Sequence, residues 1–412
     1  MSKPELLFLA HRIPYPPDKG DKIRSWNILR HLAETFDVHL GAFVDDPEDR
    51  DHEAFLRTVC KQVFLLDMKP SARLPRLLNG LRTGRPLSIA AWDDRRMQDF
   101  ASGLLDRGGI EHVFVFSGQM APYALKHSGR SRMIMMDFVD IDSDKFRQYA
   151  RQAKWPMTKV HEREADLLSQ FEKHVARNVD ASLFVSNAEA ELFKSYAGSY
   201  AHTVYALHNG VDLEFFSPDA DFTPLSLPGS PSLVMTGAMD YRPNIDAAIW
   251  MAKAILPLVR QRHPDATFTI VGSKPTNDVK ALDTKPGVTV TGRVDDVRPY
   301  LAAADIAVAP VRIARGVQNK VLEAMAMGVP VVSTEPAFSG IDADPGRDLL
   351  VADQPSQFAD AIIRLAESEA DRKMLGEAGR AQMEARYSWS HQLSELDEII
   401  ERHDRDLRRH TQ

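Results

Sequence analysis

Short apolar runs alternate with longer segments of helical periodicity along most of the chain. Such alternation is typical of a parallel sheet whose two faces are covered by helices. The expected strands of the first half are Glu5–Ala10, Val38–Val44, Gln62–Leu66, His112–Phe116, Met133–Asp137, Ala181–Val185 and Thr203–Leu207. After a break the alternation resumes, with expected strands at Ser232–Gly237, Ala266–Gly272, Val288–Thr291, Ile306–Pro310 and Val329–Ser333. The pattern predicts an α/β protein with two doubly wound parallel sheets.

The break between the two halves has the composition of a linker. Asn209-Gly210 is a turn signal, and four prolines between positions 218 and 231 follow it in a stretch without periodicity. A chain of 412 residues exceeds one ordinary core, so two domains of roughly 150–200 residues each are expected.

Composition narrows the functional classes. The chain is 44% hydrophobic and 26% charged, as in a globular enzyme. The net charge is −7, whereas nucleic-acid-binding proteins usually carry an excess of basic residues, so no nucleic-acid partner is expected. Cys60 is the only cysteine, which fits a reducing compartment. The first apolar segment is too short for a signal peptide and no run is long enough to span a bilayer, so a cytoplasmic protein is predicted.

One carboxylate stands out within an apolar helix late in the chain. Gly316 precedes this helix, Gly328 ends it, and Glu323 lies inside it with Asn319 one turn earlier and Lys320 nearby. A carboxylate there costs free energy unless something donates hydrogen bonds to it, and the ribose hydroxyls of a sugar nucleotide are suitable donors. The helix N-terminus would offer N–H groups to a diphosphate. A surface glutamate on an amphipathic helix is the alternative.

The segment LEAMAMGVPVV, residues 322–332, resembles the signature of the retaining nucleotide-sugar glycosyltransferases of family 4. That resemblance implies the GT-B fold, in which two Rossmann-like domains face each other across a cleft. The acceptor domain would comprise residues 1–212 with 388–412, and the donor domain residues 213–387. In the family two glutamates eight positions apart bracket the motif; the second corresponds to Glu323, whereas Arg315 occupies the first position. Because the family's first glutamate touches the donor sugar, the resemblance implies nucleotide binding more directly than sugar contacts.

Three further segments resemble a narrower group within family 4. DKGDKIRSW, DFVDIDSDKF and ARGVQNKVLEAMAMG are similar to the sugar transferases associated with exosortase (PEP-CTERM) and exopolysaccharide gene clusters. The resemblance implies a UDP- or GDP-sugar donor and a glycan or lipid-linked glycan acceptor, in exopolysaccharide biosynthesis. It implies no cofactor and no metal, because GT-B enzymes act without one.

The donor site is expected to combine glycines, cations and the helix around Glu323. Gly20 follows the first strand and permits close backbone approach, although an ordinary strand-to-helix connection explains it equally. Family members usually carry two basic residues here for the donor diphosphate, and this sequence has only one of them, Arg242. Lys320 is a candidate to replace the missing cation. Arg293 is a second phosphate candidate, or a partner of Asp295 or Asp296. The predicted donor-binding residues are Gly20, Arg242, Arg293, Gly316, Asn319, Lys320 and Glu323, and the predicted catalytic residues are Asp140, Arg315 and Glu323.

Two acidic motifs in the first half have competing interpretations. Asp140 and Asp142 have the D-x-D spacing of metal-dependent glycosyltransferases of another fold, but they follow a strand of a Rossmann-like domain, so we expect a role in acceptor binding or in shaping the cleft. Ser186 is expected to cap a helix, with Glu189 completing a capping box. A family segment near the cleft is the alternative for Ser186.

A basic segment without acidic residues runs from Lys69 to Trp92. Its leucines recur at helical spacing, and such a segment suits an anionic membrane surface. A helix packed on the first domain with a solvated basic edge is the alternative, and Pro75 and Gly80 are expected to limit the helix. The predicted membrane-contacting residues are Lys69, Arg73, Arg76, Arg82 and Arg85.

These features together predict a metal-independent hexosyltransferase that acts with retention. A nucleotide-sugar 2-epimerase and a non-catalytic nucleotide-sugar-binding protein are the alternatives. A NAD-dependent oxidoreductase is less consistent with the sequence, which lacks the glycine fingerprint of that class.

Overall fold

The computed structural model describes residues 3–68, 70–127, 132–313 and 317–410. The chain divides into two compact units. Unit 1 comprises Met1–His208 with Leu393–Gln412, and unit 2 comprises Asn209–Gln392. The resemblance placed these boundaries at residues 212 and 388. None of the helices in the described ranges is long and apolar enough to cross a membrane.

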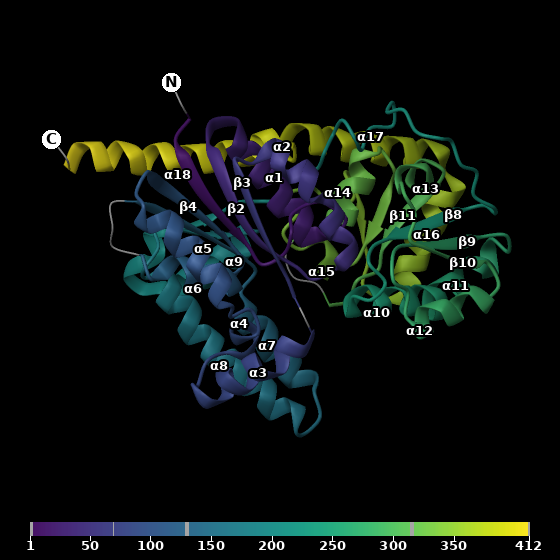
Figure 1. Cartoon of the computed structure of the whole chain (residues 1–412). Coiled ribbons are helices and arrows are strands. Elements are labelled where there is room, and N and C mark those ends of the chain that lie inside the picture. Colours follow the sequence, from purple (N-terminus) through teal and green to yellow (C-terminus); the bar gives the residue numbers. More distant parts are fainter. Residues whose placement is uncertain (1–2, 69, 128–131, 314–316, 411–412) are drawn as a thin grey trace. The chain divides into compact units, whose positions relative to one another are not determined.

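Unit 1 is built on a seven-stranded parallel sheet with the order β3-β2-β1-β4-β5-β6-β7 (Figure 1). Its strands are β1 Glu5–Ala10, β2 Asp37–Val44, β3 Gln62–Asp67, β4 Ile110–Phe116, β5 Met133–Val139, β6 Ala181–Phe184 and β7 Val204–Ala206. Its helices are α1 Gly20–Thr35, α2 Glu53–Val59, α3 Pro70–Arg82, α4 Leu87–Ala90, α5 Arg95–Asp106, α6 Ala121–Leu125, α7 Asp142–Gln152, α8 Met157–Ala176 and α9 Asn187–Ala197. All seven strands predicted from the sequence are present.

The C-terminal helix α18, Trp389–His410, continues into unit 1. There His31 Nε2 lies 2.8 Å from Asp397 Oδ1, and His112 Nε2 lies 3.0 Å from Asp404 Oδ1. Unit 1 therefore contains both ends of the chain.

Unit 2 is built on a six-stranded parallel sheet with the order β10-β9-β8-β11-β12-β13. Its strands are β8 Ser232–Thr236, β9 Thr267–Val271, β10 Val288–Gly292, β11 Ile306–Ala309, β12 Val331–Ser333 and β13 Leu350–Val351. Its helices are α10 Arg242–Trp250, α11 Leu256–Arg262, α12 Asn277–Lys280, α13 Arg298–Ala302, α14 Asn319–Ala326, α15 Glu335–Phe338, α16 Pro355–Glu367 and α17 Glu369–Arg386. The two-residue strand β13 was not predicted, because so short a segment carries no periodicity.

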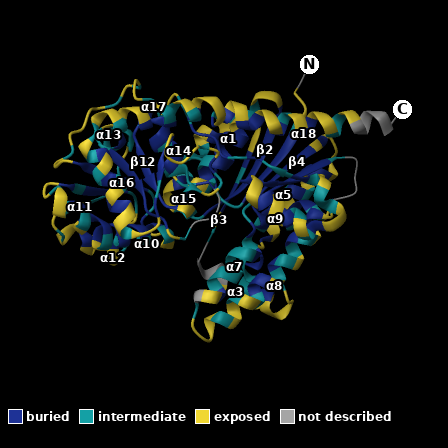
Figure 2. Cartoon of the chain, turned by 180° about the vertical axis from the view of Figure 1, so that it is seen from behind, coloured by how far each residue is buried: buried dark blue, intermediate teal, exposed yellow. Residues whose placement is uncertain are grey.

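Both sheets are buried between helices, as Figure 2 shows. Apolar runs without alternation are the mark of parallel strands covered on both faces, and β1 illustrates this, since Leu6–Ala10 is fully buried. In each sheet the strand order reverses once, between β1 and β4 in unit 1 and between β8 and β11 in unit 2. Ligands of open α/β sheets bind beyond the carboxyl ends of the strands at such a reversal.

The prediction that Pro75 and Gly80 limit the basic helix is wrong. Helix α3 is continuous from Pro70 to Arg82, with Pro75 inside it. Its position is fixed by Arg76, which donates to the Ala91 carbonyl at 3.3 Å and to Asp94 at 2.6 Å. Gly80 serves packing, because a Cβ there would lie 2.6 Å from the Cβ of Ala90 in α4.

Candidate active site

Glycines line the carboxyl edge of the unit 2 sheet. Gly237 follows β8, Gly272 follows β9, and Gly292 ends β10. A Cβ on Gly272 would lie 1.7 Å from the Gly237 carbonyl oxygen, so no other residue fits there. Gly237 itself has a φ of +143°, which L-residues rarely adopt. Gly237 and Gly272 therefore pack backbone against backbone, and the edge presents bare backbone that a phosphate or sugar can approach closely.

Helix α14 begins beside this glycine-lined edge and is tied to it by side chains. Lys320 Nζ donates to Asn244 Oδ1 at 2.5 Å, and Asn244 Nδ2 donates to the Ala238 carbonyl at 2.9 Å. Asn319 Oδ1 accepts from Asn209 Nδ2 at 3.1 Å. The start of α14 is thus held against the loop after β8. The contacts of Asn244, Asn209, Gly237 and Gly272 were not predicted from the sequence, because they are visible only in three dimensions.

Glu323 and Lys320 form an electrostatically coupled pair on α14. Burial raises the pKa of Glu323 to about 7, opposed by the positive charge of Lys320. Burial likewise lowers the pKa of Lys320 to about 8, opposed by the charge of Glu323. Among the described residues, none donates a hydrogen bond to the Glu323 carboxylate. The site therefore holds a half-buried carboxylate whose ionised form a hydroxyl-bearing ligand would stabilise.

The remaining predicted donor residues are distributed over both units. Arg242 is the first residue of α10 and Arg293 directly follows β10, and both are exposed at the carboxyl edge of unit 2. Asp296, one of the partners considered for Arg293, is held by Arg298 at 2.7 Å. Gly20 is the first residue of α1, in unit 1. The predicted residues Arg315 and Gly316 lie outside the described residues.

In unit 1, Asp140 directly follows an unusual turn at the end of β5. Arg24 and Asp137 are both fully buried and paired, with Arg24 Nε donating to Asp137 Oδ2 at 2.8 Å. Asp137 Oδ1 also accepts from the Val139 amide at 3.0 Å, and Val139 has a φ of +68°, a strained conformation for a β-branched residue. The buried pair thereby turns the chain so that Asp140 lies at the carboxyl edge.

Two buried glutamates hold the segment after Asp140. Glu172 accepts from the Ser143 amide and Glu189 from the Ile141 amide, each at 2.9 Å. Burial raises the pKa of Glu172 to about 8 and that of Glu189 to about 7. Within the described ranges, no group of histidine, cysteine, aspartate and glutamate side chains is arranged to hold a metal ion.

The capping prediction for Ser186 is confirmed, and the prediction of a complete capping box is wrong. Ser186 Oγ accepts from the Glu189 amide at 3.2 Å, as an N-cap does. The Glu189 carboxylate does not complete the reciprocal bond, because it accepts from Ile141 instead. Glu189 therefore supports the loop that carries Asp140.

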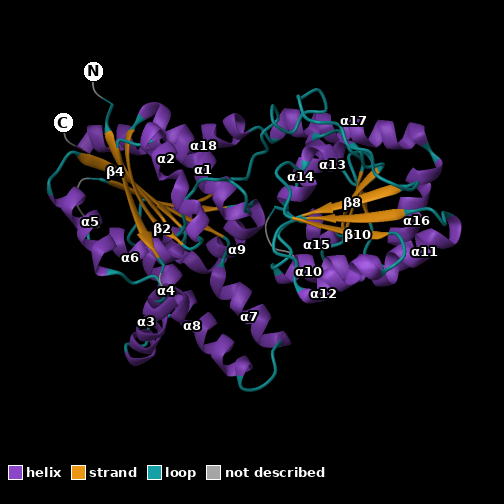
Figure 3. Ribbon diagram, turned by 45° about the vertical axis from the view of Figure 1, so that its right-hand side comes forward, coloured by secondary structure: helices purple, strands orange, loops and turns teal. Residues whose placement is uncertain are grey.

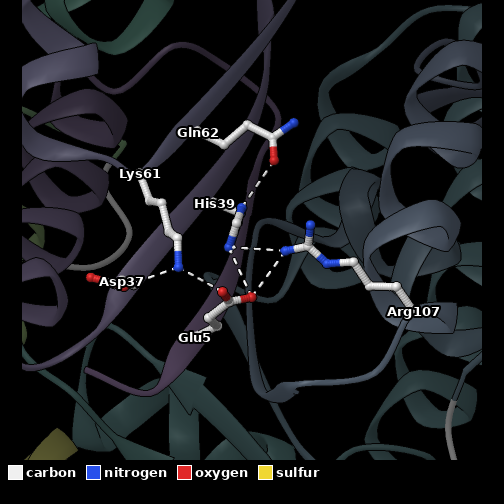
Figure 4. A network of polar contacts seen from close by, with 6 residues as sticks. All are labelled: Glu5, Asp37, His39, Lys61, Gln62 and Arg107. Atoms are coloured by element: carbon white, nitrogen blue, oxygen red, sulfur yellow. Dashed lines mark hydrogen bonds and ion pairs between the residues drawn. The ribbon is translucent and has the colours of Figure 1, made fainter. Parts of the chain in front are cut away.

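A second polar network lies at the opposite, amino edge of the unit 1 sheet (Figure 4). The Glu5 carboxylate accepts from Lys61 at 2.6 Å and from Arg107 at 2.9 Å, and it lies 3.2 Å from His39 Nε2. The hydrogen bond from Lys61 lowers the pKa of Glu5. These groups neutralise one another and join the starts of β1, β2 and β3, so we assign the network to fold stability.

Comparison with known proteins connects unit 2 to sugar transfer. Residues 230–368 match the family described as "Glycosyl transferases group 1". The matched segment lies within unit 2. This match covers the strands, glycines and helix α14 described above.

Two curated relatives are mannosyltransferases. The chain is 30% identical over 248 residues to a GDP-mannose-dependent monoacylated alpha-(1-6)-phosphatidylinositol monomannoside mannosyltransferase of Corynebacterium glutamicum, covering 56% of this chain and 64% of that protein. It is 29% identical over 220 residues to a phosphatidyl-myo-inositol mannosyltransferase of Propionibacterium freudenreichii, covering 52% of this chain and 53% of that protein. The chain therefore matches less than two thirds of each relative's length.

Solved structures establish the fold over nearly the whole chain. Anabaena HepE in complex with UDP and glucose superposes with a TM-score of 0.66 at 14% identity, covering 97% of this chain and 99% of that one. Sucrose-phosphate synthase from Thermosynechococcus elongatus gives a TM-score of 0.71 at 19% identity, covering 97% and 98%. The fold is that of the GT-B glycosyltransferases, as the sequence predicted.

Proposed function

We propose that this chain is a glycosyltransferase that moves a hexosyl group from a nucleoside-diphosphate sugar to a glycan or lipid-linked glycan. The observation that carries the proposal is the position of Glu323 and Lys320 on α14, where Lys320 is bonded to Asn244 and lies against Gly237 at the carboxyl edge of the unit 2 sheet. The edge lies within the segment that matches the glycosyltransferase family. The mannosyltransferase names of the two relatives support the same class of reaction.

The donor would occupy the carboxyl edge of unit 2. Its ribose hydroxyls would donate to the Glu323 carboxylate, and its diphosphate would meet the start of α14 together with Arg242, Arg293 and Lys320. A helix start and arginine side chains are both suited to phosphate oxygens. As the bond from sugar to phosphate breaks, the leaving diphosphate gains charge, and these fixed groups would stabilise it. The donor is proposed to be a UDP- or GDP-sugar, since one relative is GDP-mannose-dependent and one structural neighbour binds UDP.

We further propose that transfer retains the configuration of the sugar and needs no metal ion or other cofactor. The chain itself supplies the cations for the diphosphate, namely Arg242, Arg293 and Lys320. An acceptor hydroxyl would attack on the face from which the diphosphate leaves. Asp140, at the carboxyl edge of unit 1, is the proposed contact on the acceptor side. Gly20 is a proposed donor contact, and Arg315 is the proposed catalytic position next to the donor sugar.

The acceptor is proposed to be lipid-linked, with the protein acting in exopolysaccharide biosynthesis at the cytoplasmic face of a membrane. The basic helix α3 supports this, because cations on an amphipathic helix suit anionic headgroups. The names of the two mannosyltransferases, which refer to phosphatidylinositol acceptors, point the same way.

A thermal-shift screen with UDP, GDP and ADP tests the proposal. A nucleotide that binds the native state raises the unfolding temperature by mass action. We expect UDP or GDP to raise it and Glu323→Gln to weaken the effect. Transfer of radiolabelled sugar from the matching donor to a membrane extract is then expected. Absence of stabilisation by all three nucleotides would contradict the proposed donor site.

A further inference from the structure

Helices α7 and α8 form a hairpin whose tip exposes large apolar side chains. Trp155, in the turn between the two helices, is 81% exposed, and Met157 and Val160 at the start of α8 are also exposed. The buried residues of α8 begin only at Glu164, so its first two turns do not pack on the core of unit 1. Folding alone does not explain an apolar tip that two helices hold away from the core.

Helix α3 exposes a second apolar stripe in the same unit. Leu74, Leu78 and Leu81 recur at helical spacing, so they lie on one face, and all three are exposed. Together the hairpin tip and α3 carry six of the twelve exposed large hydrophobic residues found among the described residues. Figures 1 and 3 show α3, α7 and α8 at the same end of unit 1, away from the N-terminus.

Both segments are basic in a chain that is acidic overall. Residues 69–92 and residues 145–161 each contain five lysines or arginines and no acidic residue, whereas the whole chain has a net charge of −7. Some of these cations are paired, such as Arg76 with Asp94 and Lys159 with Glu162. Among the described residues, Arg82, Arg151 and Lys154 have no ion-pair partner. Arg82 is next to Leu81 in the sequence, Lys154 is next to Trp155, and Arg151 is four residues before Trp155.

We propose that the α7–α8 hairpin tip and α3 form a single docking surface for an anionic lipid bilayer. Trp155 and Met157 insert at the boundary between headgroups and acyl chains, and Arg82, Arg151 and Lys154 meet the phosphates. Tryptophan suits this depth because its ring is apolar and its N–H is polar. The surface thereby extends the lipid contact proposed for α3 to a second, independent element.

The chemistry favours lipid over a second copy of the chain. A symmetric dimer through this surface would place the same basic residues opposite one another, and like charges across an interface repel. An anionic bilayer offers complementary charge and an apolar interior to the same surface.

The surface also lies where a lipid-linked acceptor would have to enter. Helix α3 follows the carboxyl end of β3 and α7 follows the carboxyl end of β5. Both therefore emerge from the edge that carries Asp140. This last step rests on the proposed function, whereas the docking itself does not.

Vesicle binding tests the proposal on the full chain. We expect sedimentation with vesicles of phosphatidylcholine and phosphatidylglycerol in equal amounts, and weaker sedimentation with phosphatidylcholine alone. Trp155→Ser with Met157→Ser should lower vesicle affinity about tenfold or more. Lys154→Glu with Arg151→Glu should remove the preference for phosphatidylglycerol. Met374→Ser, at an exposed methionine on α17, is the matched control and should bind like the wild type.

Tryptophan emission locates the contact. Trp155 should shift to shorter wavelength when vesicles are added, and Trp155→Phe should keep binding but lose most of that shift. Equal vesicle binding by the wild type and the Trp155→Ser, Met157→Ser variant would overturn the proposal. The proposal would also be overturned if sedimentation velocity showed that the wild type is a dimer and that the Trp155→Ser, Met157→Ser variant is a monomer. The Trp155→Ser, Met157→Ser variant should still be stabilised by UDP or GDP. If the wild type binds vesicles but no nucleotide, the docking proposal is supported and only the proposed function is contradicted.

Discussion

Lys320 donates a 2.5 Å hydrogen bond to Asn244, although 76 residues separate the two in the sequence. The bond joins the start of α14 to the first turn of α10. Asn244 Nδ2 in turn donates to the Ala238 carbonyl, in the loop after β8, at 2.9 Å. Because the ammonium group is held by a neutral amide, its charge is not cancelled at this contact. Lys320 is therefore positioned as a cation beside the glycine-lined edge.

Replacement of Asn244 should loosen this connection. Asn244→Ala leaves the Lys320 ammonium and the Ala238 carbonyl without this partner, so we expect a loss of about 1–3 kcal/mol in the free energy of unfolding. Urea denaturation measures it. Asn277→Ala, at an exposed asparagine on α12, is the control and should stay within about 0.5 kcal/mol of wild type. Equal stability of the two variants would contradict the role given to Asn244.

A methyl group at Gly272 should disrupt the glycine-lined edge. Its Cβ would lie 1.7 Å from the Gly237 carbonyl oxygen, and both are backbone positions that cannot rotate away. We expect Gly272→Ala to lower the free energy of unfolding by about 3 kcal/mol or more, the upper range of overpacking. Gly103→Ala, in α5 with open space around the new methyl, should instead raise it by about 0.5–1 kcal/mol. A tolerated Gly272→Ala would show that the edge is not close-packed.

Burial of Glu172 predicts a specific dependence of stability on pH. Its pKa is about 8 in the fold and 4.5 in its ordinary range, so the folded state favours the protonated form. This contribution is fully present below pH 4.5 and is lost as the pH rises through 8. Glu172→Gln copies the protonated form, so it should be more stable than wild type above pH 8 and closest to it near pH 4.5.

The melting temperatures of wild type and Glu172→Gln, measured from about pH 4.5 to above pH 8, test this prediction. Glu401→Gln, at an exposed glutamate of α18, should follow the wild type at every pH. If the difference between wild type and Glu172→Gln does not grow with pH, the carboxyl of Glu172 is not protonated in the fold.

Incubation with donor alone separates transfer from epimerisation. A transferase should leave the sugar of the donor unchanged at C2 when no acceptor is present. We therefore expect a single sugar nucleotide by NMR after incubation with UDP- or GDP-hexose, and consumption of the donor only after acceptor is added. Formation of the 2-epimer without acceptor would identify the protein as an epimerase.

The sequence predicted the elements whose signal is local. Buried parallel strands are apolar throughout, so every expected strand was found, and Gly328 ends α14 with a φ of +68°, as expected. Glu323 was identifiable because a charge within an apolar helix stands out against its neighbours. In these cases a few adjacent residues contain the physical cause.

Features that depend on distant contacts were missed or misread. Glu189 fitted a capping box by spacing, yet its carboxylate binds the Ile141 amide, 48 residues away. Pro75 was expected to stop α3, whereas contacts of Arg76 with the segment after α4 hold the helix in place. Trp155 carried no signal in the sequence, since its exposure follows from the way α8 leaves the core.

The central claim is that the Glu323 carboxylate binds the ribose of a nucleotide. The most direct measurement is the ratio of dissociation constants for UDP or GDP and its 2′,3′-dideoxy analogue, by calorimetry at a pH between about 7 and about 8. There Glu323, with a pKa of about 7, is mostly ionised, and Lys320, with a pKa of about 8, is still mostly protonated. We predict that wild type and the exposed control Glu377→Gln prefer the ribonucleotide by about tenfold or more, and that Glu323→Gln loses most of this preference. A preference that persists unchanged in Glu323→Gln would contradict the assignment.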